Sequence, residues 1–170
     1  IHRNTSSSLE GLTKRQNFFQ LDDKGRGASI SNYRYSGYDR GHLVPSSDMQ
    51  LNEISMRESM YMTNMTPQTP AFNRGVWKKL ESKIREKTIE WDKDKKGLTI
   101  ITGQFGKIAE IGKDKIPVPE YFYKIAFDTN KNRAIAFLIP NERSIRDLQT
   151  YAVSINYLEK LTGIDFFYKL

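Results

Sequence analysis

The most informative stretch of the sequence is Tyr38-Asp39-Arg40-Gly41-His42, in which one of only two histidines follows an acid, an arginine and a glycine. A proton acceptor that titrates near neutrality thus stands beside a fixed positive charge. Gly41 allows the backbone to bend or to be approached closely. Such a grouping suits attack on a phosphodiester, because the imidazole can take a proton from water while the guanidinium faces the anion.

Two later stretches make this short pattern specific, since four residues alone recur by chance. They are Asn64-Met65-Thr66-Pro67-Gln68 and Phe72-Asn73-Arg74-Gly75-Val76-Trp77-Lys78-Lys79-Leu80-Glu81. Apolar residues recur at three- and four-residue spacing from Arg74 to about Trp91, which predicts a helix. Trp77 shares that apolar stripe, so we expect it to anchor the core rather than to stack on a base.

Composition excludes several classes of site. The 170 residues predict one domain over 1–170 with a hydrophobic core. The absence of cysteine rules out disulfides, thiolate chemistry and cysteine zinc sites, and two histidines are too few for a multi-histidine zinc site. No apolar run approaches the ~20 residues that span a bilayer, so no membrane insertion is expected.

The net charge of +7 is spread along the chain, which predicts a basic face or cleft. Charge alone favours a solvated surface, and a polyanionic partner becomes the better interpretation only when the motifs are added. The first residues, Ile1-His2-Arg3-Asn4, lack the charged start and apolar stretch of a signal peptide. They look like the interior of a longer chain, so we expect an upstream N-terminal segment.

The pattern of elements predicts an α+β fold, with a mixed or antiparallel sheet core and flanking helices. It has no internal repeats and no regular βαβ alternation. We expect loop over most of 1–32, one short helical turn at most within 46–60, and a charged loop at 92–97. Ser154 is expected to cap a last short helix that Gly163 closes. Strands are predicted at 33–44 (irregular, ending near His42), 61–65 (stopped by prolines), 98–102, 121–128 and 133–139.

A metal ion would stabilise the negative charge on the leaving oxygen, but the sequence lacks the dense cluster of carboxylates that usually binds one. Asn73, at the mouth of the long helix, offers one amide oxygen, which suffices for a Mg²⁺ ion that keeps several waters. Glu81 lies eight residues on, about 12 Å along a continuous helix, so both could not ligate one ion directly. Either the segment before Val76 folds back, or Glu81 acts through a metal-bound water. By spacing alone, an exposed pair of Glu81 with Arg85 is favoured.

These stretches closely resemble the DNA/RNA non-specific endonucleases. That family includes cyanobacterial and other bacterial sugar-non-specific nucleases and mitochondrial endonuclease G, and its members share a ββα-metal active-site motif. The resemblance runs from about residue 13 to near the end, and the cyanobacterial type is nearest. Further similarity lies in Lys14-Arg15-Gln16-Asn17-Phe18, Ile101-Thr102-Gly103, Ile116-Pro117-Val118-Pro119 and Leu158-Glu159-Lys160-Leu161-Thr162-Gly163.

The resemblance implies the metal chemistry residue by residue. His42 would be the general base that deprotonates the attacking water. Asn73 would be the sole direct protein ligand of a hydrated Mg²⁺, for which Mn²⁺ can substitute. Glu81 would hold a metal-bound water, which agrees with the spacing. Asp39 is expected to brace the turn rather than to join the chemistry.

The resemblance also implies the substrate contacts. Arg40 and Arg15 would flank the scissile phosphate, and Arg74 would be a further contact. Asn64 would orient a neighbouring group or the phosphate; the alternative is that it caps a turn before Pro67, a common use of asparagine.

The implied function is Mg²⁺-dependent hydrolysis of DNA and RNA to products with 5′-phosphates. An indiscriminate nuclease must be exported or sequestered, so we expect secretion or the periplasm in a bacterium and the mitochondrial intermembrane space in a eukaryote, and a protein inhibitor. The alternative is a nuclease-fold protein that binds nucleic acid with little or no cleavage, against which the intact His42, Asn73 and Glu81 argue. A basic structural domain would explain the charge but not the motifs. The sequence does not specify oligomeric state.

Overall fold

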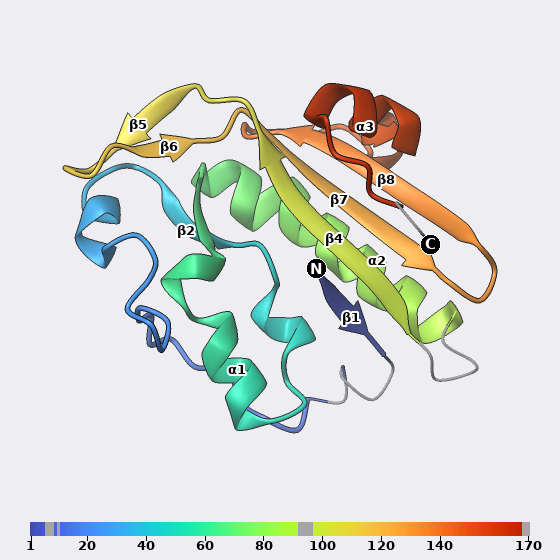
Figure 1. Cartoon of the computed structure of the whole chain (residues 1–170), viewed down its shortest axis with the longest axis horizontal. Helices are drawn as coiled ribbons and strands as arrows, with labels where there is room; N and C mark the ends of the chain where they lie inside the picture. Colours follow the sequence, from blue (N-terminus) through green and yellow to red (C-terminus); the bar gives the residue numbers. More distant parts are fainter. Residues whose placement is uncertain (6–8, 10, 92–96, 168–170) are drawn as a thin grey trace.

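The computed structural model describes residues 1–5, 9, 11–91 and 97–167, which build an antiparallel sheet with helices on both faces (Figure 1). Each strand of this sheet runs antiparallel to its neighbours. In spatial order the strands are β1 (His2–Asn4), β4 (Leu98–Phe105), β7 (Tyr121–Asp128), β8 (Arg133–Pro140) and β9 (Ala152–Val153).

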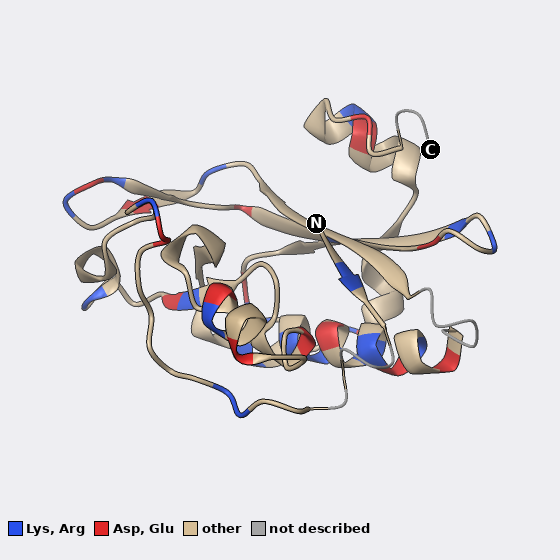
Figure 2. Ribbon diagram, turned by 60° about the horizontal axis from the view of Figure 1, so that its bottom comes forward, with Lys and Arg blue, Asp and Glu red and all other residues tan. Residues whose placement is uncertain are grey.

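The two faces of the sheet carry different helices, α2 (Lys78–Trp91) and α3 (Ile155–Thr162) (Figure 2). Alternate residues of β7 point to opposite sides, as the two-residue period of a strand requires. Phe122 belongs to the hydrophobic cluster that includes the buried side chains of α2. Ile125 belongs to a second cluster, on the other face, that includes Leu158 of α3. The α+β class with an antiparallel sheet is thereby confirmed.

The long helix begins with a π-helical segment, η5 (Phe72–Trp77), before the regular α2. Gly75 has non-helical angles, φ −105° and ψ −108°, so the segment from Asn73 to Glu81 is kinked. The 12 Å separation expected for a continuous helix therefore does not apply. Trp77 is 1% exposed and stacks on Phe72, which confirms it as a core anchor.

Two small antiparallel pairs flank the main sheet. β2 (Asp39–His42) pairs with β3 (Met65–Gln68), opposite the start of the long helix, and together they form the two strands and helix of the ββα arrangement. β5 (Ala109–Ile111) pairs with β6 (Ile116–Val118). The short helices are α1 (Glu53–Ser59), η2 (Ile30–Tyr33), η3 (Ser46–Asp48), η4 (Met62–Asn64) and η6 (Leu148–Tyr151).

Several predicted elements are confirmed. The strands expected at 98–102, 121–128 and 133–139 correspond to β4, β7 and β8, and the helix expected from Arg74 corresponds to η5 and α2. Ser154 caps α3, since its hydroxyl oxygen accepts from the Tyr157 amide, and Gly163 ends it in the left-handed region. The charged loop predicted at 92–97 lies almost wholly outside the described residues.

Among the described residues, the loop expected over most of 1–32 is found, apart from β1, which pairs with β4, and the start of η2. Two predicted elements are wrong. The segment 46–60 holds more than one helical turn, since α1 spans seven residues and is capped by Asn52. The strand expected at 61–65 lies at Met65–Gln68 and includes Pro67, which a two-stranded pair tolerates because both of its strands are edges. Among the described residues, none of the helices has the length and apolar character needed to cross a membrane.

Candidate active site

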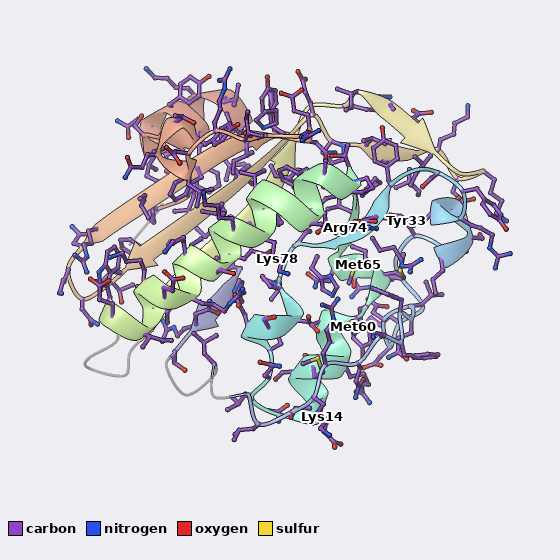
Figure 3. The ribbon with its side chains drawn as sticks, turned by 180° about the vertical axis from the view of Figure 1, so that it is seen from behind. Lys14, Tyr33, Met60, Met65, Arg74 and Lys78 are labelled. Atoms are coloured by element: carbon purple, nitrogen blue, oxygen red, sulfur yellow. The ribbon has the colours of Figure 1, made fainter. Side chains whose placement is uncertain are left out.

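A cleft of about 450 Å³ opens between β2, the loop after it and the start of the long helix. Figure 3 shows Arg74 and Lys78 along the side of the helix that faces β2 and β3. The structure brings all but one of the sequence-predicted site residues to this cleft. Its lining consists of Arg15, Arg40, His42, Pro45, Ser46, Ser47, Asn73, Arg74, Lys78, Glu81 and Arg85.

His42 lies at the end of β2, beside the aromatic ring of Phe19. The two ring centroids are 6.0 Å apart, and the Arg40 guanidinium carbon lies 4.4 Å from the centroid of the same Phe19 ring. Within the described residues, the buried Nε2 of His42 has no hydrogen-bond partner. Burial, and then the nearby charge of Arg15, lower the pKa of His42 to about 4, so the ring is neutral at neutral pH.

Gly41 is required for the close approach of β2 to β3. A Cβ at this position would overlap the side chain of Gln68, which is fully buried between the strands. The expectation that Gly41 permits a close approach is therefore confirmed, whereas its φ is not in the left-handed region.

Asp39 joins β2 to the start of the long helix. Its carboxylate accepts from Nδ2 of Asn73 at 2.9 Å and from Nε and Nη2 of Arg74 at 2.9 and 2.6 Å. Burial alone would raise the pKa of Asp39, but the bonds from Arg74 and Asn73 outweigh it and the pKa is lowered. Asp39 is thus an ionised brace, as expected, but it connects β2 with the start of the long helix rather than bracing the turn.

Asn73 and Glu81 have the character of ligands for a hard cation. The side-chain nitrogen of Asn73 donates to Asp39. The side-chain oxygen, Oδ1, is therefore the atom of this amide that could bind a cation in the cleft. Burial raises the pKa of Glu81 to about 7, although Lys124 opposes the rise, so a nearby cation would stabilise the carboxylate. Within the described ranges, no three His, Cys, Asp or Glu residues cluster as a metal site, so any ion here would keep most of its waters.

Glu81 does not pair with Arg85, and the spacing argument for that surface pair is wrong. Glu81 is 13% exposed and lies 3.8 Å from Nζ of Lys124, a residue of β7 that is 1% exposed. Nζ of Lys124 also lies 4.8 Å over the Trp77 ring and 3.4 Å from the Leu43 carbonyl oxygen. Burial lowers the pKa of Lys124. Arg85 turns instead to Asp48, at 2.9 Å.

Asn64 is the predicted site residue that does not line the cleft. Its Oδ1 accepts from the Val44 amide at 2.9 Å, and its Nδ2 donates to the carbonyl oxygens of Val44 and Ser59. The Asn64 carbonyl oxygen also accepts from the Leu43 amide. Asn64 thus fixes the backbone directly after His42. Its side chain does not form the predicted cap of a turn before Pro67.

Sequence reasoning missed Lys78, Arg85, Lys124 and Phe19 as parts of this site. Lys78 and Arg85 had a detectable signal, since Arg74, Lys78, Glu81 and Arg85 follow one another at spacings of four, three and four. These spacings put all four on one face of a helix. Phe19 and Lys124 carry no comparable local signal, because only the tertiary fold brings them into contact with residues that line the cleft.

Known proteins resemble this chain in sequence and in fold. A nuclease from Nostoc sp. is 36% identical, over 95% of this chain and 63% of its own length. The human mitochondrial nuclease EXOG is 31% identical, over 79% of this chain and 41% of its own length. A chain in the crystal structure of the EndoG/EndoGI complex superposes with a TM-score of 0.86 at 25% identity, over 99% of this chain and 77% of that chain.

The chain spans less than two thirds of the length of the nucleases that it matches in sequence. A mitochondrial nuclease of Schizosaccharomyces pombe shows the same relation, with 31% identity over 81% of this chain and 48% of its own length. The family model itself matches throughout, from residue 1 to residue 170. The chain therefore belongs to the DNA/RNA non-specific endonuclease family.

Proposed function

We propose that this protein is a metal-dependent endonuclease that hydrolyses phosphodiester bonds of DNA and RNA and leaves 5′-phosphates. The observation that carries the proposal is the convergence of a neutral histidine, an amide and carboxylate pair, and five basic side chains in one cleft. Arg15, Arg40 and Arg74 bind the phosphate backbone, which favours little sequence readout, since phosphate contacts do not distinguish bases.

His42 is the general base in this proposal. A neutral imidazole nitrogen takes the proton of the attacking water, while Arg40 and Arg15 offset the charge that develops on the phosphate oxygens. The bond between phosphorus and the 3′-oxygen breaks, so the phosphate stays with the 5′ end of the downstream product. Asn64 supports the base indirectly, because it fixes the backbone that follows His42.

Asn73 would hold a Mg²⁺ ion directly, with Mn²⁺ as a substitute, and Glu81 would hold it through one of its waters. The free amide oxygen of Asn73 and the raised pKa of Glu81 support this assignment. When bound, such an ion supplies positive charge for the leaving oxygen. The basic cleft would also suit an acidic protein inhibitor, and export or sequestration is expected of a nuclease with so little selectivity.

Plasmid nicking with and without EDTA tests the proposed function. We expect relaxed and then linear DNA, and degraded RNA, in Mg²⁺ or Mn²⁺, and no cleavage in the chelator. Asn73→Ala should lose cleavage at limiting Mg²⁺. Cleavage that persists in EDTA would refute the metal assignment, and the absence of any cleavage by the full-length protein would favour nucleic-acid binding without turnover.

A further inference from the structure

We propose that Asp48 is a positioning residue of this active site, which holds the Arg85 guanidinium at the cleft and is itself held by His2 and Asn4 of β1. The proposal rests on the proposed function, since the position of Arg85 matters only if the cleft binds a phosphate. It assigns a role in the site to β1, a strand whose residues do not line the cleft.

The Arg85 guanidinium is fixed at both of its ends. Nη1 donates to Oδ1 of Asp48 at 2.9 Å, and Nη2 donates to Oγ of Ser82 at 3.1 Å. Asp48 is the last residue of η3, whose first two residues, Ser46 and Ser47, line the cleft, and its side chain is 4% exposed. The Arg85 side chain is 20% exposed, so it can still reach a ligand in the cleft.

The other oxygen of Asp48 is held from β1. Oδ2 lies 3.1 Å from Nε2 of His2 and accepts from Nδ2 of Asn4 at 2.9 Å. Burial lowers the pKa of His2 below its ordinary value, which makes the neutral ring with a proton on Nε2 the donor here. Burial alone would raise the pKa of Asp48, but its bonds from His2, Asn4 and Arg85 outweigh it and the pKa is lowered. An ionised carboxylate is the acceptor that satisfies all three donors.

Asp48 separates Arg85 from Glu81. The two residues are one helical turn apart, a spacing at which arginine and glutamate pair readily. Without Asp48, Glu81 would be a carboxylate available to Arg85, whose charge already acts on it. That pairing would draw the guanidinium away from the phosphate and occupy the carboxylate assigned to the hydrated metal ion. Asp48 therefore keeps the Arg85 guanidinium available for the phosphate and the Glu81 carboxylate available for the hydrated metal ion.

A double-mutant cycle on turnover tests the proposal. Asp48→Asn should lower kcat about tenfold and change KM much less, because one hydrogen bond between charged groups is lost or rearranged. Arg85→Ala should lower kcat at least as much. In the Arg85→Ala protein, Asp48→Asn should then have no further effect on kcat, since the aspartate acts through that arginine. Glu86→Gln is the matched control, because it removes an exposed ion pair with Lys83 on the same helix.

The outcomes separate the two proposals. An Asp48→Asn protein with wild-type kcat, or one whose loss of kcat is undiminished in the Arg85→Ala background, would overturn the positioning role. A wild-type protein that does not cleave would refute the proposed function itself, and this inference with it.

A second pair of variants reaches the same question if Asp48→Asn does not fold. His2→Leu removes the donor from β1 and should lower kcat by about threefold, as expected for loss of one supporting hydrogen bond. His2→Gln restores a side-chain donor and should recover kcat. Equal kcat for the two variants would contradict a role for β1 in the site.

Discussion

His42 is always in the neutral form that can accept a proton at neutral pH, but it is a weak base. Its pKa of about 4 keeps the imidazole neutral throughout the neutral range, but a base this weak accepts a proton reluctantly. Burial is the main cause of the lowered pKa and the charge of Arg15 is the second, and a phosphate anion bound beside Arg15 would offset that second contribution. Substrate binding itself would thus raise the basicity of His42, which couples proton removal to an occupied cleft.

Removal of the imidazole should separate chemistry from binding. His42→Ala is expected to lower kcat by about 10²- to 10⁴-fold, the range for loss of a general base, while the affinity for DNA changes little. Single-turnover cleavage and gel-shift titration of the same preparation would measure both quantities. A variant that cleaves at near-normal rates would show that another group is the base.

The lowered pKa of His42 has a consequence for stability. Between pH 6.5 and about 4 the unfolded chain binds a proton on this histidine and the folded chain does not, so folding is weakened as the pH falls through that window. The effect should be about 3 kcal/mol between pH 7 and pH 4. Urea unfolding without metal should show a steeper loss for the wild type than for His42→Gln. If the free energy of unfolding falls with pH equally in the two proteins, the lowered pKa of His42 would be contradicted.

At the scale of elements, the sequence predicts those whose pattern is local. α2 follows from its helical periodicity, β4 from a β-branched run, and α3 from its two caps. β1 and β3 could not be found in this way. Three polar residues become a strand only because β4 offers them a partner, and Pro67 argues against a strand until its two-stranded setting is known.

The residues of the site likewise fall into those that a local sequence pattern predicts and those that it does not. Arg40, His42, Asn73 and Glu81 belong to stretches with a readable pattern, and the structure brings them to one cleft. The partners that fix their charge and orientation come from distant elements, as Asp48 does for Arg85 and Lys124 does for Glu81. No local pattern predicts such contacts, because burial and long-range packing decide them.

The contact between β2 and β3 limits what Gly41 can become. Gly41→Ala places a methyl group in the space of the Gln68 side chain, and such overpacking should destabilise the protein by about 1–3 kcal/mol and misplace His42. Gln68→Ala should restore much of the loss, because it clears that space and both amide atoms of Gln68 lack partners among the described residues. Thermal unfolding and kcat of the single and double variants measure this, and failure of the second change to rescue the first would count against a steric cause.

Across the whole molecule, part of the positive charge gathers at the cleft, which is lined by five basic side chains and, among the described residues, by one acidic side chain, Glu81. Two of the five are paired with aspartates, Arg74 with Asp39 and Arg85 with Asp48. The other three form no ion pair within the described part of the chain. Under the proposed function, this uncompensated charge would attract a polyanion.

Binding should accordingly depend strongly on salt, and each cleft cation should contribute separately. Lys78→Gln should weaken DNA binding by a similar factor for different sequences and reduce the slope of log K against log[salt] by about one, because one released counterion is lost. Lys131→Gln removes the same charge from the exposed β7–β8 turn, at the end of the sheet, and should leave the slope unchanged. The measurement is a titration of DNA at several salt concentrations in the absence of divalent cations, so that cleavage does not intervene. Equal slopes for Lys78→Gln and Lys131→Gln would mean that net charge alone, rather than the cleft, attracts the substrate.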